Sequence, residues 1–331
     1  MKQINIRELL QDRVFTLTVT IAVMFVVCSF IWPNKFPTFD NISLVLLNLS
    51  IESIVAVGMM ILLISGAFDL SVGSVVAFSG GLAGYLMYYY GVFVPVAILA
   101  ALGGAALIGF INGWFVARVG INPLIQTLAM MGIVRGLALM LSGAGIQNFP
   151  ETFNAIGQVK ILGLQSPVWF MILIVAIFSI LVSSTIFFRR YYYIGGNEQA
   201  ARLSGIRVDK MKIISYVIVS LLAGFAGVLL SARLGAAMST SGQGMELRVI
   251  TAVVLGGASL LGGQGKIIGA LLGTVFMGLV SNIMILARVS GYWQQIVLGL
   301  ILILAVSIDV LLKKQGGTKP REYVKKVVSS S

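Results

Sequence analysis

The stretch Ile42–Ser65 reads ISLVLLNLSIESIVAVGMMILLIS and contains a single charged side chain, Glu52. An α-helix needs about 20 apolar residues to cross the hydrocarbon core of a bilayer, so this stretch predicts a transmembrane helix. Similar stretches occur along the whole chain and bring the predicted number of spans to about ten. The predicted fold class is therefore all-α, a polytopic transmembrane helical bundle. The predicted spans are Val14–Ile31, Ile42–Ser65, Val72–Tyr90, Val92–Val116, Pro123–Leu141, Pro167–Phe188, Ile213–Ala232, Leu247–Leu261, Ile267–Leu286 and Tyr292–Leu312.

The composition agrees with a membrane protein. Of the 331 residues, 58% are hydrophobic and only 10% are charged, against about 25% charged residues in ordinary soluble domains. The chain has no histidine and a single cysteine, Cys28, which lies inside an apolar run. These counts exclude a His-based triad, a His metal site and an internal disulfide. They also exclude a soluble enzyme, a secreted disulfide scaffold and a disordered chain.

Basic residues are distributed unequally between the two sides of the predicted bundle. With ten spans the termini share one side, which has 17 of the 23 Lys and Arg residues, while the other side has 5 and Arg135 lies within a span. Loops rich in Lys and Arg stay in the cytoplasm, so both termini are predicted to be cytoplasmic. The formal charge of +12 is therefore mainly a signal of orientation, and nucleic acid is not an expected partner.

The chain is predicted to form one transmembrane domain, 1–331. Its cytoplasmic parts are an N-terminal segment, 1–13, a basic loop, 189–212, and a basic tail, 313–331, which is expected to touch the membrane lipid through anionic headgroups. Spans two to five and seven to ten are predicted to form an inverted repeat, because span two runs inward and span seven outward.

The basic loop contains the segment Gly195–Ile206, GGNEQAARLSGI, which predicts a two-turn helix. Asn197 is a good N-cap, Glu198 sits at the positive end of the helix dipole and can pair with Arg202, and Gly205 stops the helix. Helix propensity and a small apolar face come from Ala200, Ala201 and Leu203. Two interpretations stay open: an ordinary capped surface helix, or a docking helix for a cytoplasmic partner.

A second notable segment, Ser65–Ser74, reads SGAFDLSVGS and lies between two apolar runs. A carboxylate here is costly in lipid, so Asp69 is expected to face a cavity, a partner or the cytoplasmic interface. Asp69 or Ser71 can cap the following helix. One interpretation is a capped turn, and the other is a gate or hinge near the cytoplasmic mouth. The gate or hinge would consist of Gly66, Asp69, Ser71, Gly73 and Ser74.

Four motifs, SGAFDLSVGS, INPLIQTLAMMGIVRGLAL (Ile121–Leu139), GGNEQAARLSGI and AVVLGGASLLGGQGKIIGALLG (Ala252–Gly273), follow one another in this order. In order and spacing they resemble the ribose-type sugar permease subunits of bacterial ABC importers, within the monosaccharide and branched-chain amino acid permease superfamily. The resemblance covers nearly the whole chain. It implies a location in the bacterial inner membrane and a core of two permease copies, as a homodimer or with a close paralogue. It also implies cytoplasmic ABC ATPase subunits and an extracytoplasmic sugar-binding protein.

The same resemblance implies that the helix Asn197–Gly205 is the coupling helix that meets the ATPase. Gly265-Lys266 does not complete a phosphate loop, because Leu260 and Ile267 stand where the pattern requires Gly and Ser or Thr. The chain is therefore expected to bind no cofactor itself and not to be an enzyme. ATP and Mg²⁺ would be bound by the partner ATPase.

Polar residues inside the predicted spans are candidates for a sugar path, since a sugar must exchange its water contacts for amides and hydroxyls. The alternative for each residue is a structural role, in which its side chain forms a hydrogen bond between helices. A pair between Glu52 and Arg135 is one way to neutralise a charge inside a span. The candidates for the translocation path are Glu52, Asn112, Asn122, Gln126, Thr127 and Asn282, with Asn48 and Gln294 as further polar positions.

The sequence thus predicts a permease subunit that moves a monosaccharide inward by alternating access, driven by ATP hydrolysis in a partner. The alternative is an ion-coupled secondary carrier of a small polar solute, with Glu52 or Asp69 as the coupling carboxylate. The capped helix in a basic loop favours the first hypothesis, because a secondary carrier does not need it. A membrane enzyme ranks third, since few groups are available for a catalytic constellation.

Overall fold

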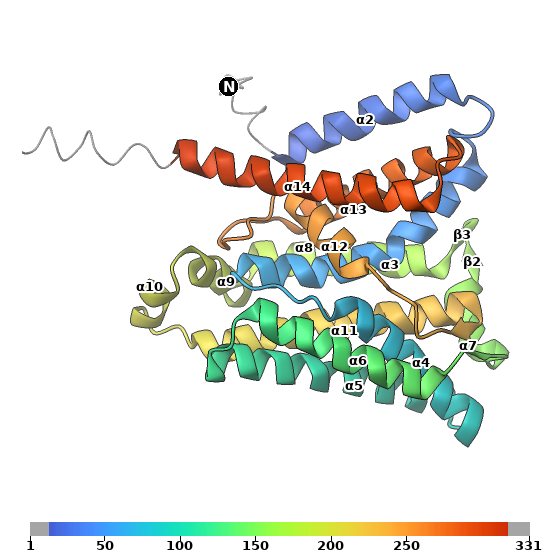
Figure 1. The fold of residues 1–331 in the computed structure, drawn as a ribbon, viewed down its shortest axis with the longest axis horizontal. Coiled ribbons are helices and arrows are strands. Elements are labelled where there is room, and N and C mark those ends of the chain that lie inside the picture. Colours follow the sequence, from blue (N-terminus) through green and yellow to red (C-terminus); the bar gives the residue numbers. More distant parts are fainter. Residues whose placement is uncertain (1–12, 317–331) are drawn as a thin grey trace, which may run out of the picture.

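The computed structural model describes residues 13–316, and within them the chain is a bundle of helices (Figure 1). The predicted terminal segments, 1–13 and 313–331, lie largely outside the described residues. The helices are α2 (Arg13–Ile31), α3 (Phe39–Ile64), α4 (Val72–Tyr90), α5 (Val94–Trp114), the π-helix η1 (Phe115–Val119), α6 (Pro123–Ser142), α7 (Glu151–Gln158), α8 (Ser166–Ser184), α9 (Ile186–Gly196), α10 (Glu198–Leu203), α11 (Val208–Leu234), α12 (Met245–Leu255), α13 (Ile267–Leu286) and α14 (Gly291–Gly316). Two short antiparallel ladders pair β1 (Ile146–Gln147) with β4 (Ala236–Ala237) and β2 (Lys160–Ile161) with β3 (Leu164–Gln165).

The predicted all-α transmembrane bundle is confirmed. Within residues 13–316, seven helices are long and apolar enough to cross a membrane: α2, α3, α5 with η1, α6, α8, α11 and α13. α4 has 19 residues but is less apolar, and the described apolar part of α14 is Gly291–Ser307. The number of crossings and the side on which the termini lie stay predictions.

The predicted eighth span, Leu247–Leu261, is wrong. α12 has only 11 residues, so it is about 16 Å long, roughly half of the hydrocarbon thickness. The helix ends at Gly256, and Gly257 follows with a positive φ of 96° that side-chain-bearing residues rarely adopt. The apolar run continues past this break, which is why hydropathy alone predicts a full span. The sixth span is also shorter than expected, because α8 ends at Ser184 and a separate helix, α9, begins at Ile186.

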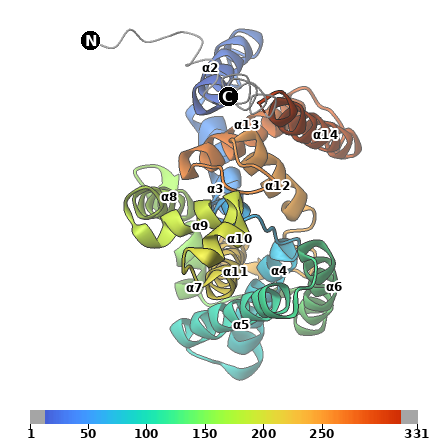
Figure 2. The same ribbon diagram turned by 90° about the vertical axis from the view of Figure 1, so that its left-hand side faces the viewer.

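The two longest of the central helices, α3 and α11, form the middle of the bundle. Of the most apolar window of α3, 89% is buried inside the protein, as expected for a helix that is hydrophobic all round. α11 packs against α3, α4, α5 and α7. Viewed from the α10 end, α3 and α11 lie between α2 and α14 on one side and α5 on the other (Figure 2).

Small residues let the central helices approach closely. A Cβ added at Gly227 in α11 would collide with the carbonyl oxygen of Val76 in α4, and one at Gly80 in α4 would collide with Ser231 in α11. Glycine at such contacts is typical of helix packing in lipid, where van der Waals contact between helices replaces the hydrophobic driving force.

Two irregular segments interrupt the bundle, and the second meets the first turn of α4, directly after the first segment. Residues 65–71 connect α3 to α4, and residues 238–244 connect β4 to α12. In Figure 1 these segments run toward the middle from opposite ends of the molecule. A Cβ at Gly73 would collide with the carbonyl oxygen of Gly242, and a Cβ at Gly242 would crowd the backbone of Gly73. In both halves a long central helix precedes an irregular segment and a shorter helix, and the inverted repeat stays a prediction.

We expect Gly227→Ala to destabilise the protein, because the added methyl group meets a backbone carbonyl that cannot turn aside. Overpacking of this kind costs about 1–3 kcal/mol. The midpoint of thermal unfolding in detergent should therefore fall. Gly103→Ala in α5 is the matched control, since nothing lies within 4 Å of its added Cβ. An equal fall for both variants would contradict the close contact between α4 and α11.

Candidate functional site

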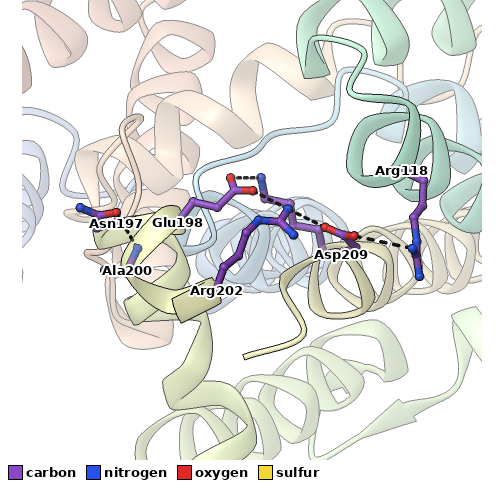
Figure 3. A network of polar contacts seen from close by, with 7 residues as sticks. Arg118, Asn197, Glu198, Ala200, Arg202 and Asp209 are labelled. Atoms are coloured by element: carbon purple, nitrogen blue, oxygen red, sulfur yellow. Dashed lines mark hydrogen bonds and ion pairs between the residues drawn. The ribbon is translucent and has the colours of Figure 1, made fainter. Parts of the chain in front are cut away.

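The predicted helix in the basic loop is present as α10 and has the predicted ends (Figure 3). The side chain of Asn197 accepts a hydrogen bond from the backbone N–H of Ala200 at 3.0 Å, which makes Asn197 the N-cap. The Arg202 guanidinium lies 2.8 Å from the Glu198 carboxylate, so the predicted pair across one turn is confirmed. Gly205, with a φ of 80°, follows the end of the helix.

An ion-pair network joins α10 to the two neighbouring elements (Figure 3). The Lys212 ammonium, in α11, lies 2.6 Å from the second oxygen of Glu198. Arg202 also contacts Asp209 of α11 at 2.5 Å, and Arg118 of η1 lies 3.8 Å from the other oxygen of Asp209. Asp209, Lys212 and Arg118 were not predicted as partners, because only the fold brings η1 and α11 beside α10.

The charges of the network hold one another in the ionised state. Burial alone would raise the pKa of Glu198, but hydrogen bonds from Lys212 and Arg202 outweigh it, so the pKa of this carboxyl lies below its ordinary value. Hydrogen bonds to Asp209 and Glu198 raise the pKa of Arg202. α10 is therefore tied to α11 by charged groups at neutral pH.

The prediction that Ala200, Ala201 and Leu203 form one apolar face of α10 is wrong. Ala201 is buried against the protein, whereas Leu203 is 90% exposed and Ala200 is exposed. Successive helical residues are turned by about 100°, so the three side chains divide between an inner and an outer face. A groove of about 420 Å³ runs along the helix. It is lined by Tyr192, Tyr193, Gly196, Asn197, Ala200, Ala201, Ser204 and Ile206.

A second polar cluster surrounds the fully buried Asp69. One Asp69 oxygen accepts hydrogen bonds from the backbone N–H and the hydroxyl of Ser71, at 2.7 and 2.6 Å. Asn112 of α5 donates to the other oxygen at 3.2 Å, and Gln126 of α6 donates to Asn112 at 3.2 Å. Asp69 thus holds the residue that precedes α4 and connects it to α5 and α6. A gate or hinge role for Gly66, Asp69, Ser71, Gly73 and Ser74 stays a prediction.

The candidates for the translocation path do not gather in one place. Asn112 and Gln126 belong to the Asp69 cluster. Asn122 caps α6 by accepting from Leu124 N–H at 2.8 Å, and the Thr127 hydroxyl donates to the Pro123 carbonyl at 2.8 Å. Asn282 pairs with Asn41 of α3 at 2.8 Å. These bonds satisfy the polar groups locally, and a role in transport stays a prediction for each.

The hypothetical pair between Glu52 and Arg135 is wrong. The Glu52 carboxylate lies 2.7 Å from the Arg248 guanidinium, because α12 packs against α3. Arg135 donates instead to the carbonyl oxygens of Ser239 and Ser241, in the irregular segment before α12. Arg248, at the start of the predicted eighth span, lies inside α12 and neutralises the charge of α3.

A cavity of about 560 Å³ lies between α12 and α14. It is lined by Gln243, Gly244, Glu246, Leu247, Arg248, Thr251, Gln295, Leu298, Gly299 and Leu302. Among the described residues, one carboxylate oxygen of Glu246 is buried without a hydrogen-bond partner. The cavity combines a carboxylate, a guanidinium and amides beside leucines, a set that can bind the hydroxyls and the apolar face of a small polyol. Sequence reasoning missed it, since Glu246 and Gln243 precede the predicted span.

We expect low pH to loosen α10. Because the pKa of Glu198 is lowered in the folded state, the anchoring is fully present above the ordinary glutamate pKa of about 4.3 and is lost as the pH falls through the folded value. A spin label at Gln199→Cys, in a Cys28→Ser background, should report constant mobility from neutral pH down to the ordinary glutamate pKa and greater mobility only at lower pH. Glu198→Gln should raise the mobility already at neutral pH, and an unchanged profile in this variant would contradict the network.

Comparisons with known proteins agree with this architecture. Residues 41–306 match the family described as branched-chain amino acid transport system / permease component. The ribose import permease protein RbsC of Escherichia coli (strain K12) is 39% identical over 298 residues, which cover 88% of this chain and 92% of the relative. The L-arabinose transport system permease protein AraH of the same strain is 41% identical over 296 residues, 89% of this chain and 90% of the relative.

A ribose import permease protein of Haemophilus influenzae is 33% identical over 319 residues, 95% of this chain and 96% of the relative. No solved structure matches the chain. Family membership and the seven apolar helices among residues 13–316 identify a multi-pass protein of the bacterial inner membrane. The chain belongs to the family of branched-chain amino acid transport system permease components, in the branch that holds ribose and arabinose permeases.

Proposed function

We propose that the chain is the membrane subunit of a binding-protein-dependent ABC importer that moves a pentose-type monosaccharide into the cytoplasm. The observation that carries the proposal is the match over nearly the full length to permeases whose names specify ribose and L-arabinose import. The partners would be a cytoplasmic ABC ATPase, which binds ATP and Mg²⁺, an extracytoplasmic sugar-binding protein and a second permease copy. No bond of the sugar is broken, so the subunit itself is not an enzyme.

The ATPase would dock on α10 and the groove beside it. Leu203 is 90% exposed on this helix in a basic loop, so it offers an apolar contact to a docking partner. The ion pairs of Glu198 and Arg202 fix α10 to the start of α11. Since α11 packs against α3, α4 and α5, a displacement of α10 would be transmitted to these helices. This is the coupling step of alternating access.

The sugar would pass the cavity between α12 and α14. A pentose fits within about 560 Å³ and can offer hydroxyls to Gln243, Glu246 and Gln295. The cavity also adjoins the place where the second irregular segment meets the start of α4, because Glu246 lies against Gly73. A displacement of either segment would therefore reshape the cavity, which links the docking site to the path.

An ion-coupled carrier receives less support. Its coupling carboxylate must gain and lose a cation, whereas Glu52 is paired with Arg248 and Asp69 accepts three hydrogen bonds from Ser71 and Asn112. To separate the two mechanisms, vesicles that contain the permease, its cognate ATPase and the binding protein would be given labelled D-ribose or L-arabinose. Uptake should stop with an ATPase that cannot hydrolyse ATP and should persist when proton and sodium gradients are collapsed. Uptake without the ATPase would overturn the proposal.

We expect Leu203→Asp to prevent stable association with the ATPase, because it places a carboxylate where an apolar contact is needed. The measurement is the amount of ATPase that co-purifies with the permease. Leu162→Asp is the matched control, since Leu162 is 83% exposed in the connection between β2 and β3, far from α10. Full co-purification with Leu203→Asp would show that α10 is not the docking helix.

We expect Glu246→Gln to lower the rate of uptake at least tenfold while ATPase association stays normal, because the neutral amide binds sugar hydroxyls less strongly than a carboxylate. Thr127→Val is the control, because Thr127 is a candidate from the sequence and its hydroxyl donates a hydrogen bond to the Pro123 carbonyl of its own helix. Normal uptake with Glu246→Gln and a large loss with Thr127→Val would show that the sugar passes along α6 and not between α12 and α14.

A further inference from the structure

A separate cavity of about 590 Å³ lies beside α10, between α9 and the beginning of α11. It is lined by Phe187, Arg190, Ser204, Gly205, Ile206, Arg207, Lys210, Met211 and Ile214. Neither the docking groove nor the cavity between α12 and α14 includes its basic residues. The transport mechanism above does not use it.

The cavity has positive charge that the protein leaves unbalanced. Among residues 13–316, no acidic side chain forms an ion pair with Arg190, Arg207 or Lys210. The two nearby carboxylates, Glu198 and Asp209, are engaged by other cations of the ion-pair network. α11 also begins here, so the positive end of its dipole adds to the field. An anion is the ligand that this charge distribution favours.

The rest of the lining is apolar and continues toward the membrane. Phe187 lies in the first turn of α9, which begins two residues after the end of α8, a helix apolar enough to span the bilayer, and Ile186 beside it is 73% exposed. Ile214 lies in the first turns of α11, another such helix. The cavity therefore has cations around the loop and apolar side chains beside the ends of two membrane helices, with Phe187 just beyond α8 and Ile214 within α11. A free phosphate ion would use only the first part, whereas a phospholipid uses both.

We propose that this cavity binds an anionic glycerophospholipid. Its phosphodiester would be bound by the guanidinium groups of Arg190 and Arg207, whose geometry suits phosphate oxygens, and by the ammonium group of Lys210. Its acyl chains would lie along Phe187 and Ile214. Because Ser204 and Gly205 at the end of α10 line the same cavity, the bound lipid would brace the helix proposed to meet the ATPase. The lipid site itself does not depend on the proposed transport function.

The test measures lipid binding to the purified full-length chain without partners, by native mass spectrometry. The protein is titrated with phosphatidylglycerol or with phosphatidylcholine of the same acyl chains. One phosphatidylglycerol should be retained with at least tenfold preference, and Arg207→Gln/Lys210→Gln should reduce that affinity at least tenfold. Arg190→Gln should weaken binding severalfold. Arg189→Gln is the matched control, since it removes the same charge from the neighbouring residue, whose guanidinium bonds the Ser183 carbonyl instead.

Thermal unfolding without added lipid should be the same for all variants, which separates lost binding from misfolding. Equal retention of both lipids, or unchanged binding in the double variant, would overturn the proposal. Displacement of phosphatidylglycerol by millimolar inorganic phosphate would overturn it in favour of a free phosphate site. Loss of the lipid when the cognate ATPase is added would show that the surface belongs to the protein partner.

Discussion

The constraint on which the structure depends is that backbone polar groups inside a bilayer must be satisfied within the protein. The segments 65–71 and 238–244 are irregular, so they can lie at membrane depth only when other helices enclose them. α3 and α11 are therefore central and buried, and α4, α5 and α12 pack around them. Gly73 and Gly242 permit the second segment to touch the first turn of α4, and Arg135 donates hydrogen bonds to two carbonyl groups of that segment. The Asp69 carboxylate holds the first by a backbone N–H.

This arrangement places charge where motion can be transmitted. At one end, Glu198, Arg202 and Asp209 link a short exposed helix to the longest central helix. Near the middle, Glu52 and Arg248 link that core to α12, one wall of the cavity. The account of coupling rests on this continuity, from α10 through α11 and α3 to α12. The first and last of these contacts are ion pairs between named groups, and each can be broken by one substitution.

Features with a local cause were predictable from the sequence. The bundle followed from apolar runs, and the ends of α10 followed from Asn197 and Gly205. The Glu198–Arg202 pair follows from helical spacing alone. Features that depend on tertiary contact were not predictable. From the sequence, either Arg135 or Arg248 can neutralise the charge of Glu52. Arg248 forms the ion pair because α12 packs on α3. The half-length of α12 was missed because Ala258, Leu260 and Leu261 extend the apolar pattern past the glycines that end the helix. The cavity was missed because Gln243 and Glu246 precede the predicted span and only the fold brings them beside α14.

The central claim is that the state of the ATPase at α10 changes the cavity between α12 and α14. It is tested most directly by the distance between spin labels at Leu247→Cys and Leu298→Cys, two positions that line the cavity, in a Cys28→Ser background. The distance would be measured by pulsed electron paramagnetic resonance in the assembled transporter, without nucleotide and with ATP trapped by vanadate. The account predicts two distinct distance distributions and the loss of this difference in Arg202→Gln. A single distribution in both states would contradict it.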